Sequence, residues 1–177
     1  MNTLIKLEHL SKRFGDLEVL KDINIDIKEG EVICVIGPSG SGKSTMLRCI
    51  NQLETPTGGE IIYDNKNVTA GEIALRDMRE EVGMVFQRFN LFPMKTVLEN
   101  VMLAPVLTQK KDKHEAKRIG MELLDKVGLA SKANVYPKTL SGGQQQRVAI
   151  LQAVPDMHRT KLLLPECLSC LPVRYAG

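Results

Sequence analysis

The sequence predicts an α/β fold, with antiparallel strands near the N-terminus, a parallel core sheet and a largely helical second half. Three observations carry this prediction. Apolar and polar residues alternate in the N-terminal region, a glycine-rich loop separates an apolar stretch from an amphipathic helix, and helical spacing of apolar residues prevails after Thr96. With 177 residues and 43% apolar content, the chain is long enough for one domain with a substantial core.

Composition and charge argue against several classes of protein. A formal net charge of +3 is too small to indicate binding to nucleic acid or to an anionic membrane surface. No apolar stretch approaches the length of a membrane span and no signal peptide opens the chain, so we expect at most a peripheral role at a membrane. Cys34 and Cys49 are expected to be buried thiols, whereas Cys167 and Cys170 lack the further ligands of a zinc site.

Residues 1–36 are predicted to form antiparallel strands that lead into the glycine-rich loop. Three isoleucines between residues 23 and 27 alternate with polar residues, which is the pattern of a strand buried on one face. A turn is expected at Gly15–Asp16. Phe14 precedes this turn at a strand end, where it either belongs to the core or presents an aromatic face to a nucleotide base.

The glycine-rich loop from Gly37 to Ser44 matches the pattern Gly-x-x-x-x-Gly-Lys-Ser/Thr. A strand is predicted for Val32–Ile36 before it, and an amphipathic helix after it. Glycines allow backbone N–H groups to approach phosphates, and the dipole of the following helix favours negative charge. The pattern therefore predicts a nucleoside triphosphate site, in which Lys43 reaches the β- and γ-phosphates and the Ser44 hydroxyl binds Mg²⁺.

Two further strands are predicted before the helical region. A turn at Pro56–Gly59 leads into a strand at Glu60–Tyr63, and another strand is expected at Val82–Phe86. Ligands bind at the carboxyl ends of buried strands in α/β proteins. Gln87, which directly follows the second of these strands, is therefore a candidate ligand-facing residue.

The second half of the chain is predicted to be helical. Thr96 is a suitable N-cap for a first helix, with Glu99 at the capping-box position. A second helix is predicted for residues 112–127, with Gly128 as its C-terminal stop. A third is expected from Gln145 to about Val154.

A second glycine-rich loop, Leu140–Gln144, precedes the third helix. Ser141 is a suitable N-cap, and Gly142 and Gly143 leave the helix N-terminus bare, which predicts a second anion site. One nucleotide could use both loops of one chain. Alternatively, two copies could pair head to tail, so that the first loop of each faces the second loop of the other.

Several motifs carry a family resemblance over roughly residues 3 to 150: KRFG (12–15), VL (19–20), GPSGSGKSTMLRCIN (37–51), EII (60–62), VFQ (85–87), FNLFP (89–93), TVLENVMLAP (96–105) and LSGGQQQRVAI (140–150). In these motifs the chain resembles the ATP-binding subunits of ABC transporters. Among them it is most similar to those of bacterial polar amino-acid uptake systems, mainly through residues 89–105.

The resemblance implies a P-loop NTPase fold of ABC type. It implies a single domain over residues 1–177, comprising a β region and P-loop core (1–87), a helical signature subdomain (88–154) and a degenerate tail (155–177). The residues implied in binding ATP are Phe14, Gly37, Pro38, Ser39, Gly40, Ser41, Gly42, Lys43, Ser44 and Thr45, and those implied in contacting the ATP of a partner protomer are Leu140, Ser141, Gly142, Gly143 and Gln144. Gln87 matches the glutamine that contacts Mg²⁺ and the attacking water.

By the same resemblance, the chain is expected to bind and hydrolyse ATP with Mg²⁺ and so to power import of polar amino acids. The implied partners are a second copy in a head-to-tail homodimer, two membrane permease subunits and an extracytoplasmic amino-acid-binding protein, with no nucleic acid. The implied location is peripheral, on the cytoplasmic face of the plasma (inner) membrane.

The resemblance ends after Ile150. Family members continue into an apolar strand that ends in Asp-Glu, whereas this chain has Pro165 and Glu166 there. We also find no D-loop and no switch histidine, because His158 lies too early. The fold is therefore expected to be incomplete at the C-terminus, with Glu166 as the remaining candidate catalytic carboxylate. Either the chain is a truncated or out-of-register fragment of an ATPase, or it is a variant that binds ATP without effective hydrolysis.

Overall fold

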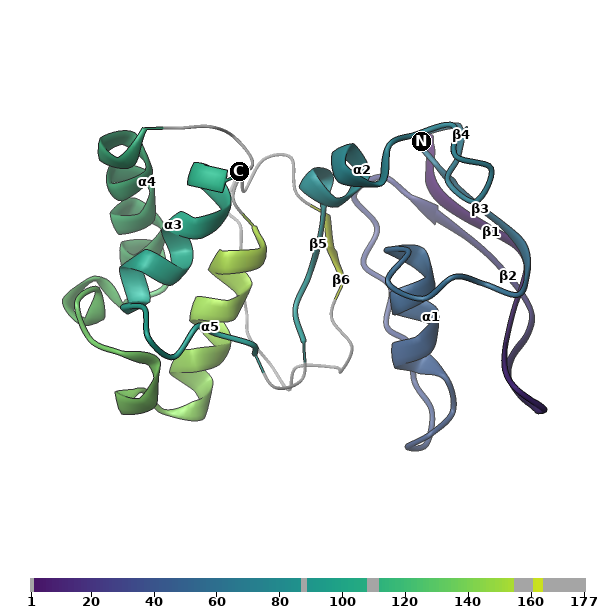
Figure 1. The fold of residues 1–177 in the computed structure, drawn as a ribbon, viewed down its shortest axis with the longest axis horizontal. Coiled ribbons are helices and arrows are strands. Elements are labelled where there is room, and N and C mark those ends of the chain that lie inside the picture. The colour runs from purple at the N-terminus through teal and green to yellow at the C-terminus, as the bar shows by residue number, and fades with distance from the viewer. Residues whose placement is uncertain (1, 87–88, 108–111, 155–160, 164–177) are drawn as a thin grey trace. The chain divides into compact units, whose positions relative to one another are not determined.

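The computed structural model describes residues 2–86, 89–107, 112–154 and 161–163 (Figure 1). These residues form two compact units, which divide between Arg79 and Glu80. The first unit holds the N-terminal strands and the glycine-rich loop, and the second holds the helices of the signature region. The subdivision expected from the sequence, with boundaries after residues 87 and 154, stays a prediction.

An antiparallel sheet dominates the first unit. Within residues 2–79 its strands are β1 (Thr3–Phe14), β2 (Leu17–Lys28), β3 (Gly58–Tyr63) and β4 (Lys66–Asn67), in the spatial order β2-β1-β3-β4. The predicted antiparallel N-terminal region and its turn at Gly15–Asp16 are therefore confirmed. Buried apolar side chains cover one face of this sheet: Ile5, Leu7, Leu10, Leu20, Ile61 and Tyr63.

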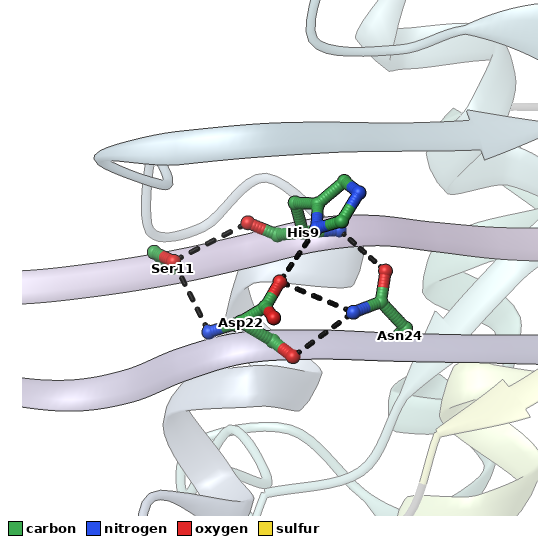
Figure 2. Close-up of polar contacts among 4 residues, drawn as sticks. All are labelled: His9, Ser11, Asp22 and Asn24. Atoms are coloured by element: carbon green, nitrogen blue, oxygen red, sulfur yellow. Dashed lines mark hydrogen bonds and ion pairs between the residues drawn. The ribbon is translucent and has the colours of Figure 1, made fainter.

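A bulge interrupts the pairing of β1 with β2. Its residues His9 and Asp22 have backbone φ angles of 51° and 48°, and the register shifts between Leu7 and Leu10. Figure 2 shows the polar contacts here: the Asp22 carboxylate lies 2.6 Å from His9 Nδ1 and accepts from the Asn24 amide at 3.1 Å. On β3, a Cβ at Gly59 would overlap the His9 carbonyl group, so only glycine fits beside the bulge.

Helix α1 (Lys43–Ile50) directly follows the glycine-rich loop, as predicted. Its buried side chains include Cys49, and burial raises the pKa of that thiol to about 11, so it stays protonated at neutral pH. Helix α2 (Leu75–Glu81) lies at the boundary of the two units. Arg79 on α2 donates to the carbonyl oxygens of Asn51 and Gln52 at 3.1 and 2.8 Å, which fixes the C-terminal end of α1.

The strand predicted for Val32–Ile36 is wrong. Residues 31–38 are neither helix nor strand, and the side chains of Val32 and Ile36 are 96% and 89% exposed. An apolar strand of a parallel sheet needs neighbouring strands that bind its backbone and layers that cover both faces. Within residues 2–79, no strand pairs with this segment, and Cys34, which was expected to be buried, is exposed.

In the second unit, β5 (Val82–Met84) pairs in parallel with β6 (Lys161–Leu163). The unit also contains helices α3 (Val97–Leu107), α4 (Lys113–Lys126) and α5 (Gly142–Ala153), and their apolar faces share one core. The core residues are Val97, Leu98, Val101, Leu123, Leu124, Leu129, Ala133, Leu140, Val148 and Leu151. Two short 3-10 helices, η1 (Ala130–Lys132) and η2 (Pro137–Thr139), connect α4 to α5.

The predicted starts of α3 and α4 are confirmed, whereas α5 begins at Gly142, three residues before the expected Gln145. At α3, the Thr96 N–H donates to the Glu99 carboxylate at 2.7 Å, and the Glu99 N–H donates to the Thr96 hydroxyl at 3.2 Å. At α4, Asp112 is the N-cap, and the helix ends before Gly128. The strand expected at Val82–Phe86 ends earlier, at Met84. None of the helices in the described ranges is long and apolar enough to cross a membrane.

Candidate functional site

The glycine-rich loop reaches α1 through a backbone conformation that requires glycine. Gly42 is the N-cap of α1 and has a φ of 88°. A Cβ there would lie 2.9 Å from the Val19 carbonyl oxygen and 3.0 Å from the Leu20 side chain. The end of the loop is thus pressed against β2, and this contact fixes where α1 begins.

Lys43 turns back into the loop that precedes it. Its ammonium group donates to the carbonyl oxygens of Gly37 and Pro38, each at 2.7 Å, and to the Ser41 hydroxyl at 3.2 Å. All three acceptors are uncharged. Because a charged acceptor makes a stronger hydrogen bond with an ammonium group than a carbonyl does, a phosphate would compete well for Lys43.

The N-terminus of α1 is suited to an anion. Among the described residues, no side chain caps the helix, and its first turn contains no acidic residue. The first backbone bond of the helix runs from the Met46 N–H to the Gly42 carbonyl at 2.8 Å, so the preceding N–H groups have no intrahelical acceptor. These donors and the positive end of the helix dipole favour a phosphate at this position.

Phe14 lies at the same end of the β1–β2 hairpin as the loop. It pairs with Leu17, two residues before Val19, which contacts Gly42. The Phe14 side chain is 45% exposed, which argues against a core residue and leaves ring surface available for a base. The Lys12 ammonium lies 4.6 Å from the centroid of its ring.

The second glycine-rich loop forms the start of α5. Ser141 is its N-cap in a complete capping box: its N–H donates to Gln144 Oε1 at 3.0 Å, and its hydroxyl accepts from the Gln144 N–H at 3.4 Å. Leu140 is buried in the core of the second unit. Gln145 donates to the Leu140 carbonyl at 3.1 Å, and Arg147 holds the C-terminal end of α4 through the Val127 carbonyl at 2.6 Å.

The glycines of this second loop differ from Gly42. A Cβ at Gly142 or Gly143 would meet no atom within 4 Å, and neither residue has a positive φ. Neither the backbone nor the packing of the described residues therefore requires glycine at these positions. Small residues here leave the start of α5 open to a group from outside the unit.

The two sets of predicted site residues lie in different units. Phe14 and the loop Gly37–Thr45 belong to the first unit, and Leu140–Gln144 to the second. Gln87 and Glu166 lie outside the described residues. Within the described ranges, no group of three or more His, Cys, Asp or Glu residues is placed to hold a metal ion.

Sequence reasoning missed Lys12 and Asn100. Lys12 is nearly buried and contacts Phe14, and the Lys-x-Phe spacing, which places both side chains on one face of a strand, was a usable signal. Asn100 is a fully buried amide inside the apolar run of α3. The position of this single polar residue among apolar neighbours was the sequence signal that could have identified it.

The sequence profile of a family described as "ABC transporter" matches residues 20–166. The chain belongs to the ABC transporter family. It is 55% identical over 157 residues to the arginine transport ATP-binding protein ArtM of Bacillus subtilis, covering 87% of this chain and 65% of ArtM. It is 52% identical over 151 residues to the glutamine transport ATP-binding protein GlnQ of Geobacillus stearothermophilus, covering 85% of this chain and 62% of GlnQ.

The fold also matches solved ABC structures. The dimeric structure of the ATP-binding cassette MJ0796, in a post-hydrolysis state bound to ADP and Pi, aligns with a TM-score of 0.77 and 40% sequence identity. The alignment covers 86% of this chain and 69% of the MJ0796 chain. The predicted P-loop NTPase fold of ABC type is thus confirmed.

The ABC family match extends beyond the motifs. The profile reaches residue 166, past Ile150, where the motif resemblance ends. The chain spans 62% to 65% of the length of ArtM and of two GlnQ proteins, those of Geobacillus stearothermophilus and Escherichia coli.

Proposed function

We propose that this chain binds Mg²⁺–ATP through Gly37–Thr45, as the ATP-binding subunit of an ABC transporter. In this proposal Lys43 contacts the β- and γ-phosphates, Ser44 and Gln87 hold Mg²⁺, and Phe14 stacks on the adenine. Bound Mg²⁺ would neutralise charge on the phosphates. The described residues fit the phosphates, because the Lys43 ammonium lies inside the loop beside the uncapped start of α1, and Ser44 brings a hydroxyl to the first turn of that helix.

The contact of Lys43 with the loop carbonyls carries this proposal. An ammonium held by the carbonyl oxygens of Gly37 and Pro38 lies inside the loop, where phosphate oxygens would replace its uncharged acceptors.

The test is equilibrium binding of a fluorescent ATP analogue with Mg²⁺. We expect Lys43→Ala to weaken binding at least about tenfold, since hydrogen bonds to charged groups contribute about 1.5–3 kcal/mol. Phe14→Ala should weaken it about tenfold, as expected for loss of one base–aromatic stack. Lys66→Ala, which removes an exposed lysine on β4, is the control and should bind like the unmodified chain. Unchanged affinity in Lys43→Ala would refute the proposal.

For the second glycine-rich loop, we propose that Leu140–Gln144 faces the ATP of a second copy in a head-to-tail homodimer. The open space around Gly142 and Gly143 supports this arrangement, since no atom in the described part of the chain lies within 4 Å of a Cβ added at either residue. MJ0796, a relative of known structure, forms dimers.

A variant can separate dimerisation from folding. Gly143→Asp places a carboxylate where a partner's phosphate would approach, but among the described residues its Cβ meets no atom within 4 Å outside its own turn of helix. We expect this variant to bind ATP normally and to lose ATP-dependent dimerisation, measured by light scattering after gel filtration. Ser131→Asp on η1 adds the same charge at an exposed site and should still dimerise. Equal dimerisation by both variants would contradict the proposal.

The transporter served by the whole protein is proposed to import polar amino acids. This is supported by relatives named as arginine and glutamine transport ATP-binding proteins. The proposed partners are two membrane permease subunits and an extracytoplasmic binding protein, with the chain on the cytoplasmic face of the inner membrane. Co-purification with hydrophobic permease subunits from the source cell is the expected result. Recovery with DNA or ribosomes instead would contradict it.

A second candidate function is ATP binding without effective hydrolysis. Pro165 stands where the family has its Mg²⁺-supporting aspartate, and both Pro165 and Glu166 lie outside the described residues. Loss of that carboxylate should slow phosphoryl transfer by orders of magnitude. Phosphate release by the purified chain, compared with Glu166→Gln, separates the two functions. Robust turnover that the substitution eliminates identifies an ATPase, and binding without turnover identifies a binding module.

A further inference from the structure

Lys12 on β1 is buried to an extent that is unusual for a lysine. Its side chain is 11% exposed, and its ammonium donates to the Thr55 carbonyl at 2.7 Å and lies 3.4 Å from a Glu54 carboxylate oxygen. The same ammonium lies 4.6 Å from the centroid of the Phe14 ring. Burying an ammonium group is costly unless its partners compensate, and here a carbonyl oxygen and a carboxylate hold the positive charge against the ring.

The contacts of Lys12 join two parts of the candidate nucleotide site. Glu54 and Thr55 follow α1, the helix that begins at Lys43, and the Glu54 N–H donates to the Arg48 carbonyl of α1 at 3.1 Å. Through Lys12, the Phe14 ring is thus tied to the segment that ends α1. One nucleotide has to place its base on Phe14 and its phosphates at the start of α1 at the same time.

We infer that Lys12 is a positioning residue for the nucleotide base: it holds the Phe14 ring from one face, so that the base stacks on the other. This inference rests on the proposed nucleotide site. A ring fixed in advance loses less conformational freedom when the base binds. The cation also draws π-electron density toward its own side, which reduces repulsion between the ring and a base stacked on the opposite face.

Removing the Lys12 charge should weaken binding of the base but not binding of the phosphates. The test compares the affinity of the full chain for Mg²⁺–ATP with its affinity for Mg²⁺–tripolyphosphate, which has no base. Lys12→Met, which keeps an unbranched side chain without the charge, should lower ATP affinity about three- to tenfold and leave tripolyphosphate affinity unchanged. Lys12→Arg retains a cation and should restore most of the ATP affinity. Lys21→Met, which removes an exposed lysine of β2, is the control and should bind both ligands normally.

A double-mutant cycle with Phe14 completes the test. In the Phe14→Ala background, Lys12→Met should cause no further loss of ATP affinity, because its effect passes through the ring. Equal losses of ATP and tripolyphosphate affinity in Lys12→Met, or losses that add in the cycle, would overturn the inference in favour of a structural role. Unchanged ATP affinity in Lys12→Met would also overturn the inference, but it would not contradict the proposed phosphate site. If the unmodified chain binds neither ligand, the proposed site itself is refuted, and this inference with it.

Discussion

Single buried polar side chains organise the segments around the proposed sites. Asn100, fully buried on α3, is the clearest example: its amide oxygen accepts from the Phe92 N–H at 2.8 Å. Its amide nitrogen donates to the carbonyls of Phe92, Lys95 and Thr96 at 3.2, 3.2 and 2.9 Å. One side chain thus closes the turn that leads into α3.

Removing this amide should destabilise the second unit. In Asn100→Ala the N–H of Phe92 and several carbonyls lose their buried partner, so we expect a loss of about 1–3 kcal/mol in the free energy of unfolding. Urea denaturation measures it, with Asn134→Ala, at an exposed asparagine, as the control. Equal stability of the two variants would show that water replaces the Asn100 contacts.

The sequence predicts the structural positions of some residues but not the contacts of others. Lys43, Ser141 and Gly128 belong to local patterns whose meaning depends on neighbours within a few positions. The structure places them, as those patterns predict, at the start of α1, at the N-cap of α5 and just after the C-cap of α4. Lys12 gains its role from Thr55, 43 positions away, and from a strand register that no local pattern contains.

At the scale of elements, loops and caps decide where helices begin. The contrast between Gly42 and Gly142 is informative, because each lies at the start of a helix that follows a glycine-rich loop. Gly42 needs both its positive φ and its missing Cβ, whereas Gly142 needs neither.

This contrast can be measured directly. Gly42→Ala forces an alanine into a left-handed conformation and toward the Val19 carbonyl, so we expect a loss of about 1–3 kcal/mol in the free energy of unfolding. Gly142→Ala should leave stability unchanged or slightly raised, because alanine favours helix. Thermal melts of both variants test the pair, and an equal loss in both would contradict this assignment.

The cap of α4 predicts a dependence on pH. Asp112 accepts from the N–H groups of Glu115 and His114, and these bonds hold the pKa of its carboxyl below the ordinary value of 3.8. A carboxyl with a lowered folded-state pKa stabilises the fold above its unfolded pKa, and this contribution is lost as the pH falls through the folded-state pKa.

The substitution Asp112→Asn, which keeps a neutral cap, isolates the contribution of the Asp112 carboxylate to the pH dependence of stability. Asparagine caps helices about as well as aspartate but does not titrate. Between pH 7 and pH 3 the variant should therefore lose less stability than the unmodified chain, as measured by urea denaturation at both pH values. An identical pH dependence in the two proteins would show that Asp112 contributes nothing to acid sensitivity.

The strand predicted for Val32–Ile36 shows the limit of element prediction. Its apolar run is typical of a buried parallel strand, but such a strand forms only if other segments pair with it and cover it. Hairpin strands such as β1 and β2 find their partner within the next turn of the chain, and the sequence predicted these well.

At the scale of the whole molecule, the chain carries the two glycine-rich loops of the ABC family in two compact units. It spans 62% to 65% of the length of ArtM and the two GlnQ proteins. Family membership was predictable because both loops are short, local patterns. In the proposed function, hydrolysis would depend on residues after Ile150, which the motifs do not match, so ATP binding and turnover must be tested separately.

The central claim is that residues 37–45 bind the phosphates of Mg²⁺–ATP. Hydrogen–deuterium exchange of the full chain, followed by mass spectrometry, tests this claim because it shows which peptides the nucleotide protects. Adding Mg²⁺–ATP should slow exchange in the peptide containing Gly37–Thr45, because phosphate oxygens would accept from its uncapped N–H groups. The peptide containing β3 and β4 should not change, and Lys43→Ala should abolish the protection. Exchange at residues 37–45 that is unaffected by saturating Mg²⁺–ATP would contradict the account.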